Sequence, residues 1–182
     1  MFARRAALFL PVLGAACARR PGPFEATTLA PPAPLSCVPF ARELSGVRLR
    51  GDAHTWWRAA EGRYTRASRP VPGAVLVFKA TRRLPEGHLA VVVREQGPRE
   101  VLASHANWGA GSARGRVHQN QPVVDVSPGN DWTLVRVWHP ESGGLGATRF
   151  PTWGFVLPPH RRSPEEIAAD VPRATQAALA SA

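Results

Sequence analysis

LSCVPFAR, at residues 35–42, and GHLAVVV, at residues 87–93, are the two stretches that decide the fold. The first predicts the start of a helix, with Ser36 as N-cap and a proline in the first turn, where its missing N–H is tolerated. The second predicts a buried strand that begins with His88. A thiol at a helix N-terminus and an imidazole on a rigid strand are the parts that a thiol nucleophile needs. We therefore expect the fold to bring Cys37 and His88 together.

The patterns around these stretches predict helices first and strands afterwards. The first helix ends at Gly46, a plausible C-cap, and residues 54–60 predict a second short helix. Apolar and alternating runs then predict strands at residues 74–78, 87–94, 101–108, 122–126, 132–138 and 153–157. This order predicts an α+β fold, in which an N-terminal helix carrying the cysteine is followed by an antiparallel sheet of five to six strands.

Residues 1–18 predict an export signal. Arg4 and Arg5 precede a short apolar run, which is well below the ~20 residues of a membrane-spanning helix. The segment LGAAC, ending at Cys17, resembles a bacterial lipobox and would put a lipid anchor on that cysteine. Cleavage within Ala16-Cys17-Ala18 by an ordinary signal peptidase is the alternative. Either route predicts an exported protein of the periplasm or cell envelope, lipid-anchored or secreted.

The remaining chain divides into a linker, a domain and a tail. Residues 19–35 hold five prolines and predict a stiff, extended linker. Residues 36–158 hold the helix and strand patterns and predict the catalytic domain. Residues 159–182 predict a peripheral, Ala-rich tail, in which a capping box at Ser163 opens a helix that Pro172 interrupts.

The composition indicates a basic, packed protein. The net charge is +10, and Lys79 is the single lysine among 23 basic residues. This charge is explained by a GC-rich genome or by attraction to an anionic polymer such as the cell wall. The arginines are scattered and form no basic helix, so we expect no nucleic-acid partner.

Two more polar residues are candidates for the site. In the strand at residues 101–108, alternation puts His105 and Asn107 on one face and Ala106 and Trp108 on the other. Either His105 or Asn107 can orient the second ring nitrogen of a base. The helix dipole and an imidazolium lower a thiol pKa to about 3.5–7.5, which we expect for Cys37. Its backbone N–H is the simplest oxyanion donor.

With these motifs in order, residues 36–157 resemble the CHAP family, the cysteine, histidine-dependent amidohydrolases/peptidases of the papain-like superfamily. The resemblance is carried by Cys37 with its helix, by PGAVLVF at residues 72–78, by GHLAVV at residues 87–92 and by SHANW at residues 104–108, with WGFV at residues 153–156 as a closing strand. It implies a papain-like CHAP fold with Cys37 as nucleophile and His88 as base.

The chain departs from the family pattern at three places. Many members have Glu-x-Asn where this chain has His105-Ala106-Asn107, so the third catalytic residue is either His105 or Asn107. Many have Gln before the cysteine, where Ser36 stands here as a possible oxyanion residue. An Asp is frequent at the position of Ala74. Some members bind calcium through an Asp-rich loop near the cysteine, but residues 19–36 contain no Asp, so no metal or other cofactor is expected.

The resemblance and the export signal together predict an exported peptidoglycan hydrolase. It would cleave an amide bond of the stem peptide, or the bond between peptide and sugar, as an amidase or endopeptidase. The alternative is a non-catalytic cell-wall-binding protein on the same scaffold, which the departures and the arginine excess favour. The two hypotheses differ in whether Cys37 is a reactive thiol.

Overall fold

The structure is a computed structural model that describes residues 24–181. The predicted export signal at residues 1–18 lies outside the described residues. In chain order, the described elements are β1 (Thr27–Leu29), α1 (Cys37–Ser45), η1 (Ala53–Thr55), α2 (Trp56–Ala59), β2 (Arg66–Ala67), β3 (Val75–Phe78), β4 (His88–Gly97), β5 (Glu100–Ala106), η2 (Gly111–Ala113), β6 (Val117–Asp125), β7 (Leu134–His139), β8 (Gly144–Leu145), β9 (Phe150–Val156) and α3 (Pro164–Ala180).

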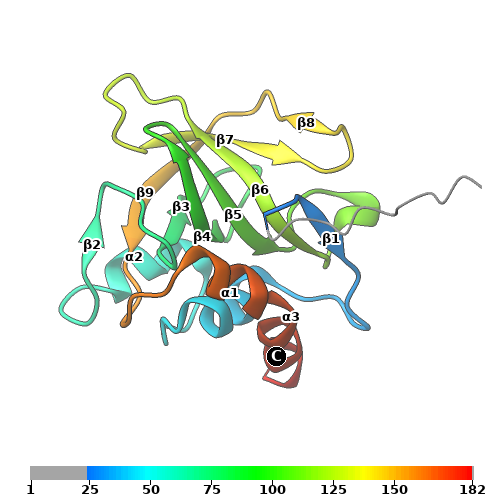
Figure 1. The fold of residues 1–182 in the computed structure, drawn as a ribbon. Helices are drawn as coiled ribbons and strands as arrows, with labels where there is room; N and C mark the ends of the chain where they lie inside the picture. Colours follow the sequence, from blue (N-terminus) through cyan, green and yellow to red (C-terminus); the bar gives the residue numbers. More distant parts are fainter. Residues whose placement is uncertain (1–23, 182) are drawn as a thin grey trace, which may run out of the picture.

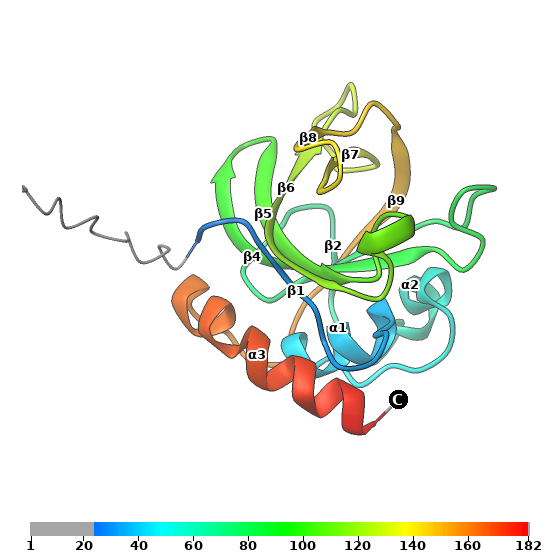
Figure 2. The same cartoon turned by 90° about the vertical axis from the view of Figure 1, so that its right-hand side faces the viewer.

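The strands form an antiparallel sheet that closes on itself. Along the sheet the order is β1-β6-β5-β4-β3-β9-β7-β8, and β6 also pairs with β7. This extra pairing closes β6, β5, β4, β3, β9 and β7 into a barrel-like ring. Figures 1 and 2 show α1, α2 and α3 gathered on one side of this ring. The predicted α+β class and antiparallel sheet are confirmed, but the described sheet has nine strands rather than the expected five to six, and its closure was not predicted.

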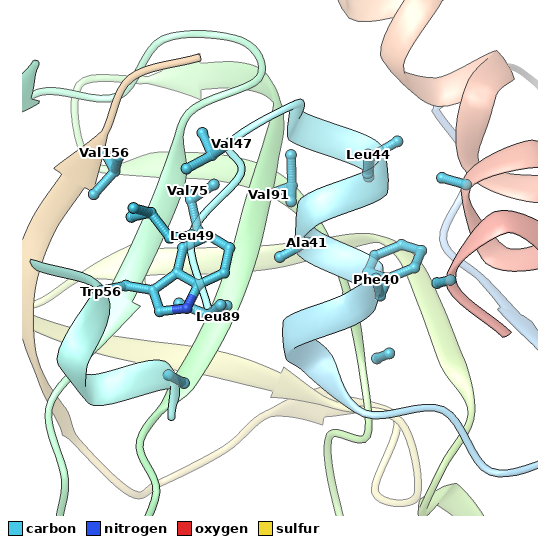
Figure 3. Packing of buried hydrophobic residues seen from close by; sticks show 14 of the residues in the cluster. Phe40, Ala41, Leu44, Val47, Leu49, Trp56, Val75, Leu89, Val91 and Val156 are labelled. Atoms are coloured by element: carbon cyan, nitrogen blue, oxygen red, sulfur yellow. The ribbon is translucent and has the colours of Figure 1, made fainter. Parts of the chain in front are cut away.

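Strand β3 and the first six residues of β4 are buried on both faces, which explains their nearly continuous apolar sequences. Alternate side chains enter two different clusters. One lies under the helices and includes Val75, Val77, Leu89 and Val91 with Phe40, Ala41 and Leu44 of α1 (Figure 3). The other includes Leu76, Phe78, Ala90 and Val92 with Trp132 and Phe155. Each fully buried side chain of this size contributes about 1.5–3 kcal/mol. The first cluster therefore holds α1 against the sheet, whereas the second contains no residue of α1.

The first helix begins and ends close to where the sequence predicts. Ser36 is the N-cap residue by position, but its hydroxyl makes no capping hydrogen bond. Gly46 ends the helix in the left-handed region, with φ 76°, and its N–H donates to the carbonyl oxygen of Arg42 at 3.0 Å. The C-terminal cap is thus confirmed. The uncapped first turn leaves backbone N–H groups available beside Cys37.

The tail is not peripheral, and this expectation was wrong. Helix α3 is continuous from Pro164 to Ala180, and its buried stripe includes Ile167 and Val171 within the cluster that α1 also joins. The predicted interruption is absent because Pro172 lies on the exposed side, while the stripe on the opposite side holds the helix by packing. The predicted capping box at Ser163 is confirmed. Figure 2 shows α3 running across the helical side of the molecule.

The described part of the predicted linker also differs from a free tether. Strand β1 pairs with β6, with Thr28 opposite His118. Leu35 is buried, and its N–H donates to the carbonyl oxygen of Gly115 at 3.0 Å. The prolines of this segment are compatible with pairing because β1 is an edge strand and contains no proline itself. The folded unit therefore extends on both sides of residues 36–158.

Most predicted strands are confirmed with shifted ends. The largest shift is in β6, which begins at Val117 rather than at residue 122. The start of β6 was not predicted because residues 118–121 are polar, although they are mostly buried in the structure. Residues 153–157 become the end of β9, which starts at Phe150. In residues 24–181, no helix has the length and apolar character needed to cross a membrane.

Candidate active site

Cys37 is the first residue of α1 and is half-buried. The chain before it is anchored by the hydrogen bond from Leu35 to Gly115. Gly115 has φ +74°, and a Cβ there would lie 2.7 Å from that of Pro34, so only glycine permits this approach. The backbone N–H of Leu89 lies close enough to the thiol of Cys37 to lower its pKa. The thiol therefore lies beside the beginning of β4, the strand that starts with the predicted base.

The glycine before His88 allows the backbone turn that places His88 in the site. Gly87 has φ +72°, and a Cβ there would lie 2.6 Å from the carbonyl oxygen of Phe78 and 2.8 Å from the backbone nitrogen of His54. A side chain at this position would clash as well as strain the backbone. His88 then pairs with Phe78 across β3 and β4, and its ring meets the Phe78 ring edge-on at 5.5 Å. The imidazole is thus held in one orientation.

His105 lies directly behind His88. Nε2 of His88 and Nδ1 of His105 are 3.0 Å apart, and His105 has no exposed surface. If His88 accepts a proton through Nδ1, its Nε2 carries hydrogen and donates to Nδ1 of His105. His105 then carries its own hydrogen on Nε2, a buried atom with no hydrogen-bond partner among the described residues. The pair has the geometry of a base and its orienter, with one donor left unmatched.

Asn107 and Trp108 do not follow the predicted alternation. Asn107 has φ 60°, which ends β5 at Ala106 and turns the chain. Trp108 therefore lies on the same side as His105, and the two rings stack at 5.4 Å, whereas we expected them on opposite faces. The Asn107 side chain accepts the N–H of Gly115 at 2.9 Å and makes no hydrogen bond to either histidine. Of the two candidate orienters, His105 is the one in contact with His88.

Burial dominates the titration of the site. It raises the pKa of the Cys37 thiol to about 11; the N–H of Leu89 opposes this rise and the carboxylate of Glu86 adds to it. Burial lowers the pKa of His88 to about 3, helped by His118, and holds the pKa of His105 well below its usual range. The expected lowering of the thiol pKa was wrong, because desolvation of a thiolate outweighs the helix N-terminus here. The free protein holds a neutral thiol and neutral imidazoles.

One cavity joins the predicted residues. Its volume is about 790 Å³, and its lining includes Ser36, Cys37, His88 and Asn107. His105 is not part of the lining and can reach a substrate only through His88. The loop that carries η2 forms another wall, with Gly109, Ala110 and Gly111. A substrate in this cavity can reach both the sulfur and the helix N-terminus.

One further residue beside the two histidines, His118, was not predicted. His118 of β6 pairs with His105 across the sheet, and their rings lie 5.9 Å apart. The run of four polar residues HQNQ after Val117 was the available signal, but it identifies no pairing partner. Among residues 24–181, no group of three or more His, Cys, Asp or Glu side chains is arranged to hold a metal ion, these histidines included.

Residues 30–107 match a family model described as the CHAP domain. The predicted relation to the CHAP family is confirmed. The matched residues include the nucleophile candidate Cys37, the base candidate His88 and both orienter candidates. CHAP domains are typically hydrolase domains, and they point to an amidase or peptidase that acts on peptidoglycan. Comparisons with curated proteins and with solved structures found no significant match.

Proposed function

We propose that this protein is an exported cysteine amidohydrolase that cleaves an amide bond of peptidoglycan, on a papain-like scaffold. Cys37 is the nucleophile, His88 the general base and His105 its orienter. The observation that carries the proposal is the placement of Cys37 and His88 in one cavity, with His88 bonded to His105 at 3.0 Å. The export signal at residues 1–18 and a lipid on Cys17 remain part of the proposal.

Before the reaction, the Cys37 thiol and the His88 imidazole are both neutral. As the sulfur attacks the amide carbon, its proton passes to Nδ1 of His88, and a tetrahedral oxyanion forms. The backbone N–H of Cys37, with Ser36 nearby, stabilises that oxygen at the uncapped helix end. The imidazolium then protonates the leaving amine, and the C–N bond breaks to give a thioester. Water, deprotonated by His88, hydrolyses the thioester and returns the thiol.

The charges of the cavity support a peptide substrate that carries its own carboxylates. Arg42, Arg83 and Arg114 line the cavity, and none has an ion pair or side-chain hydrogen bond among the described residues. Nε of Arg42 is buried and has no hydrogen-bond partner within residues 24–181. Asp52 and Glu86 also line the cavity and suit an amino group. Stem peptides of peptidoglycan offer both kinds of group, and guanidinium binds carboxylate in a bidentate manner.

The test is hydrolysis of purified sacculi by the full chain and by Cys37→Ala. The wild type should reduce turbidity and release muropeptides with a new free amine, which mass spectrometry assigns to one bond. Cys37→Ala should retain binding to sacculi and lose release. Undiminished release by Cys37→Ala would refute the nucleophile and with it the proposed mechanism.

A second candidate function is cell-wall binding without catalysis, and the raised pKa of Cys37 favours it. A neutral buried thiol is a weak nucleophile unless a base assists it. In that case the wild type would sediment with sacculi, release no muropeptide at any pH, and bind as well as Cys37→Ala. The sacculus assay therefore separates the two functions.

A further inference from the structure

The indole ring of Trp108 lies against both His88 and His105. Its ring is 4.8 Å from that of His88 and stacks on that of His105 at 5.4 Å, with an interplanar angle of 27°. The indole therefore limits the rotation of both imidazoles. Any group that fixes Trp108 also fixes the hydrogen bond between His88 and His105.

Trp108 is held at two points. Its indole Nε1–H donates to the carbonyl oxygen of Trp138 at 3.1 Å. Its own backbone carbonyl oxygen lies 3.1 Å from Nε2 of His118. A carbonyl oxygen can only accept, so Nε2 of His118 carries the hydrogen. Because burial lowers the pKa of His118, the ring is neutral near pH 7, and its Nδ1 is an acceptor.

The donor to that acceptor comes from the N-terminal segment. Thr28 lies opposite His118 in the pairing of β1 with β6, and its Oγ1 is 3.0 Å from Nδ1 of His118. The Thr28 hydroxyl therefore donates to His118, which donates to Trp108. Arg116 and His139 lower the pKa of His118, whereas the backbone carbonyls of Ala113 and Trp108 raise it. His88 and His105 also interact with His118, which lowers the pKa of both.

We propose that Thr28 and His118 are positioning residues for the His88–His105 pair and act through Trp108. The inference rests on the proposed function, because it gives a catalytic meaning to that pair. It also assigns β1 to the support of the active site, although its residues fall in the segment that the sequence indicates as a linker.

The test compares Thr28→Val with a matched control in the same strand. Thr27 also belongs to β1, and its Oγ1 donates to Oε1 of Gln119 at 2.9 Å. Thr27→Val therefore removes one hydroxyl bond between the same strands without touching a histidine. Thr28→Ser restores the hydroxyl at the tested position. All variants are made in the full chain, and their melting temperatures report any general effect on β1.

We expect Thr28→Val to reduce kcat on muropeptides ~10-fold, with KM within about twofold, because a displaced catalytic group loses rate rather than binding. Thr27→Val and Thr28→Ser should behave like the wild type. In ¹H–¹⁵N spectra of the imidazoles, Thr28→Val should shift the signals of His88 and His105, whereas Thr27→Val should not.

Equal effects of Thr28→Val and Thr27→Val on kcat and on the imidazole signals would overturn the proposal and leave Thr28 a structural role. A wild type that hydrolyses nothing would refute the proposed function instead. The imidazole spectra still decide the positioning role in that case, because they require no substrate. His118→Gln, whose amide can donate to Trp108, should keep the signals closer to the wild type than His118→Leu.

Discussion

Nε2 of His88 lies 3.0 Å from Nδ1 of His105, and the second nitrogen of His105 is buried without a partner among the described residues. His88 needs a hydrogen-bond acceptor at the position of His105 Nδ1, whereas the Nε2–H of His105 does not contribute to the orientation of His88. Substitutions of His105 that keep or remove an acceptor can therefore test whether orientation alone is its role.

His105→Asn should keep most of the activity, because its amide oxygen can accept from His88. His105→Leu should lose roughly 10²-fold in kcat, since His88 then has no group to fix its tautomer. Steady-state kinetics on muropeptides give both values, and thermal unfolding controls for the fold. Equal losses in the two variants would show that an acceptor at this position does not matter.

The activity should persist at a pH where an ordinary histidine base is protonated. Because the pKa of His88 is lowered to about 3, the ring stays neutral and able to accept a proton throughout the range from pH 5 to 8. We expect kcat/KM to be flat across this range, checked with folded protein at each pH. A decline centred near pH 6.5 would indicate an exposed, ordinary imidazole.

Acid should destabilise the fold through the buried histidines. The unfolded chain binds protons below about pH 6.5, whereas His88 does so only near pH 3 when folded. In that window the unfolded state holds more protons, so stability falls as pH decreases, by about 1.4 kcal/mol per pH unit for each such histidine. Urea unfolding between pH 8 and pH 4.5 measures the slope. His88→Gln should reduce this slope.

Gly87→Ala should damage both stability and activity. The left-handed backbone alone costs about 1–3 kcal/mol with a side chain, and the new Cβ would lie 2.6 Å from the Phe78 carbonyl oxygen. Gly62 is the matched control, since it has φ +69° but no atom within 4 Å of the position that a new Cβ would take. Chemical unfolding and sacculus hydrolysis compare the two. The strain is common to both, so only Gly87→Ala should also displace His88 and lower kcat.

Arg42→Gln should weaken the binding of substrates that carry a free carboxylate. Arg42 lines the cavity, and its guanidinium has no acidic partner among residues 24–181. We expect KM to rise about tenfold for a carboxylate-bearing stem peptide, as for loss of a charged hydrogen bond, and to change little for the amidated peptide. Arg161→Gln, at an exposed position outside this cavity, is the control. The same KM change for both peptides would contradict carboxylate recognition.

Local sequence patterns predicted much of the site because its central residues mark the ends of elements. Cys37 begins α1 and His88 begins β4, so both could be found from helix and strand signals. His118 and Thr28 could not, because their positions depend on pairing between strands separated by 90 residues. The direction of the thiol pKa shift also escaped prediction, since burial comes from the whole fold and not from the helix start.

Helix α3 has a consequence for the timing of biosynthesis. Arg162, just before α3, donates to the carbonyl oxygen of Leu44 in α1 at 2.9 Å, across 118 residues of chain. A nascent chain leaves the ribosome with the apolar side of α1 uncovered and receives α3 only after every strand of the ring has been translated. The side of α1 that faces α3 is therefore the part of this core that the chain completes last.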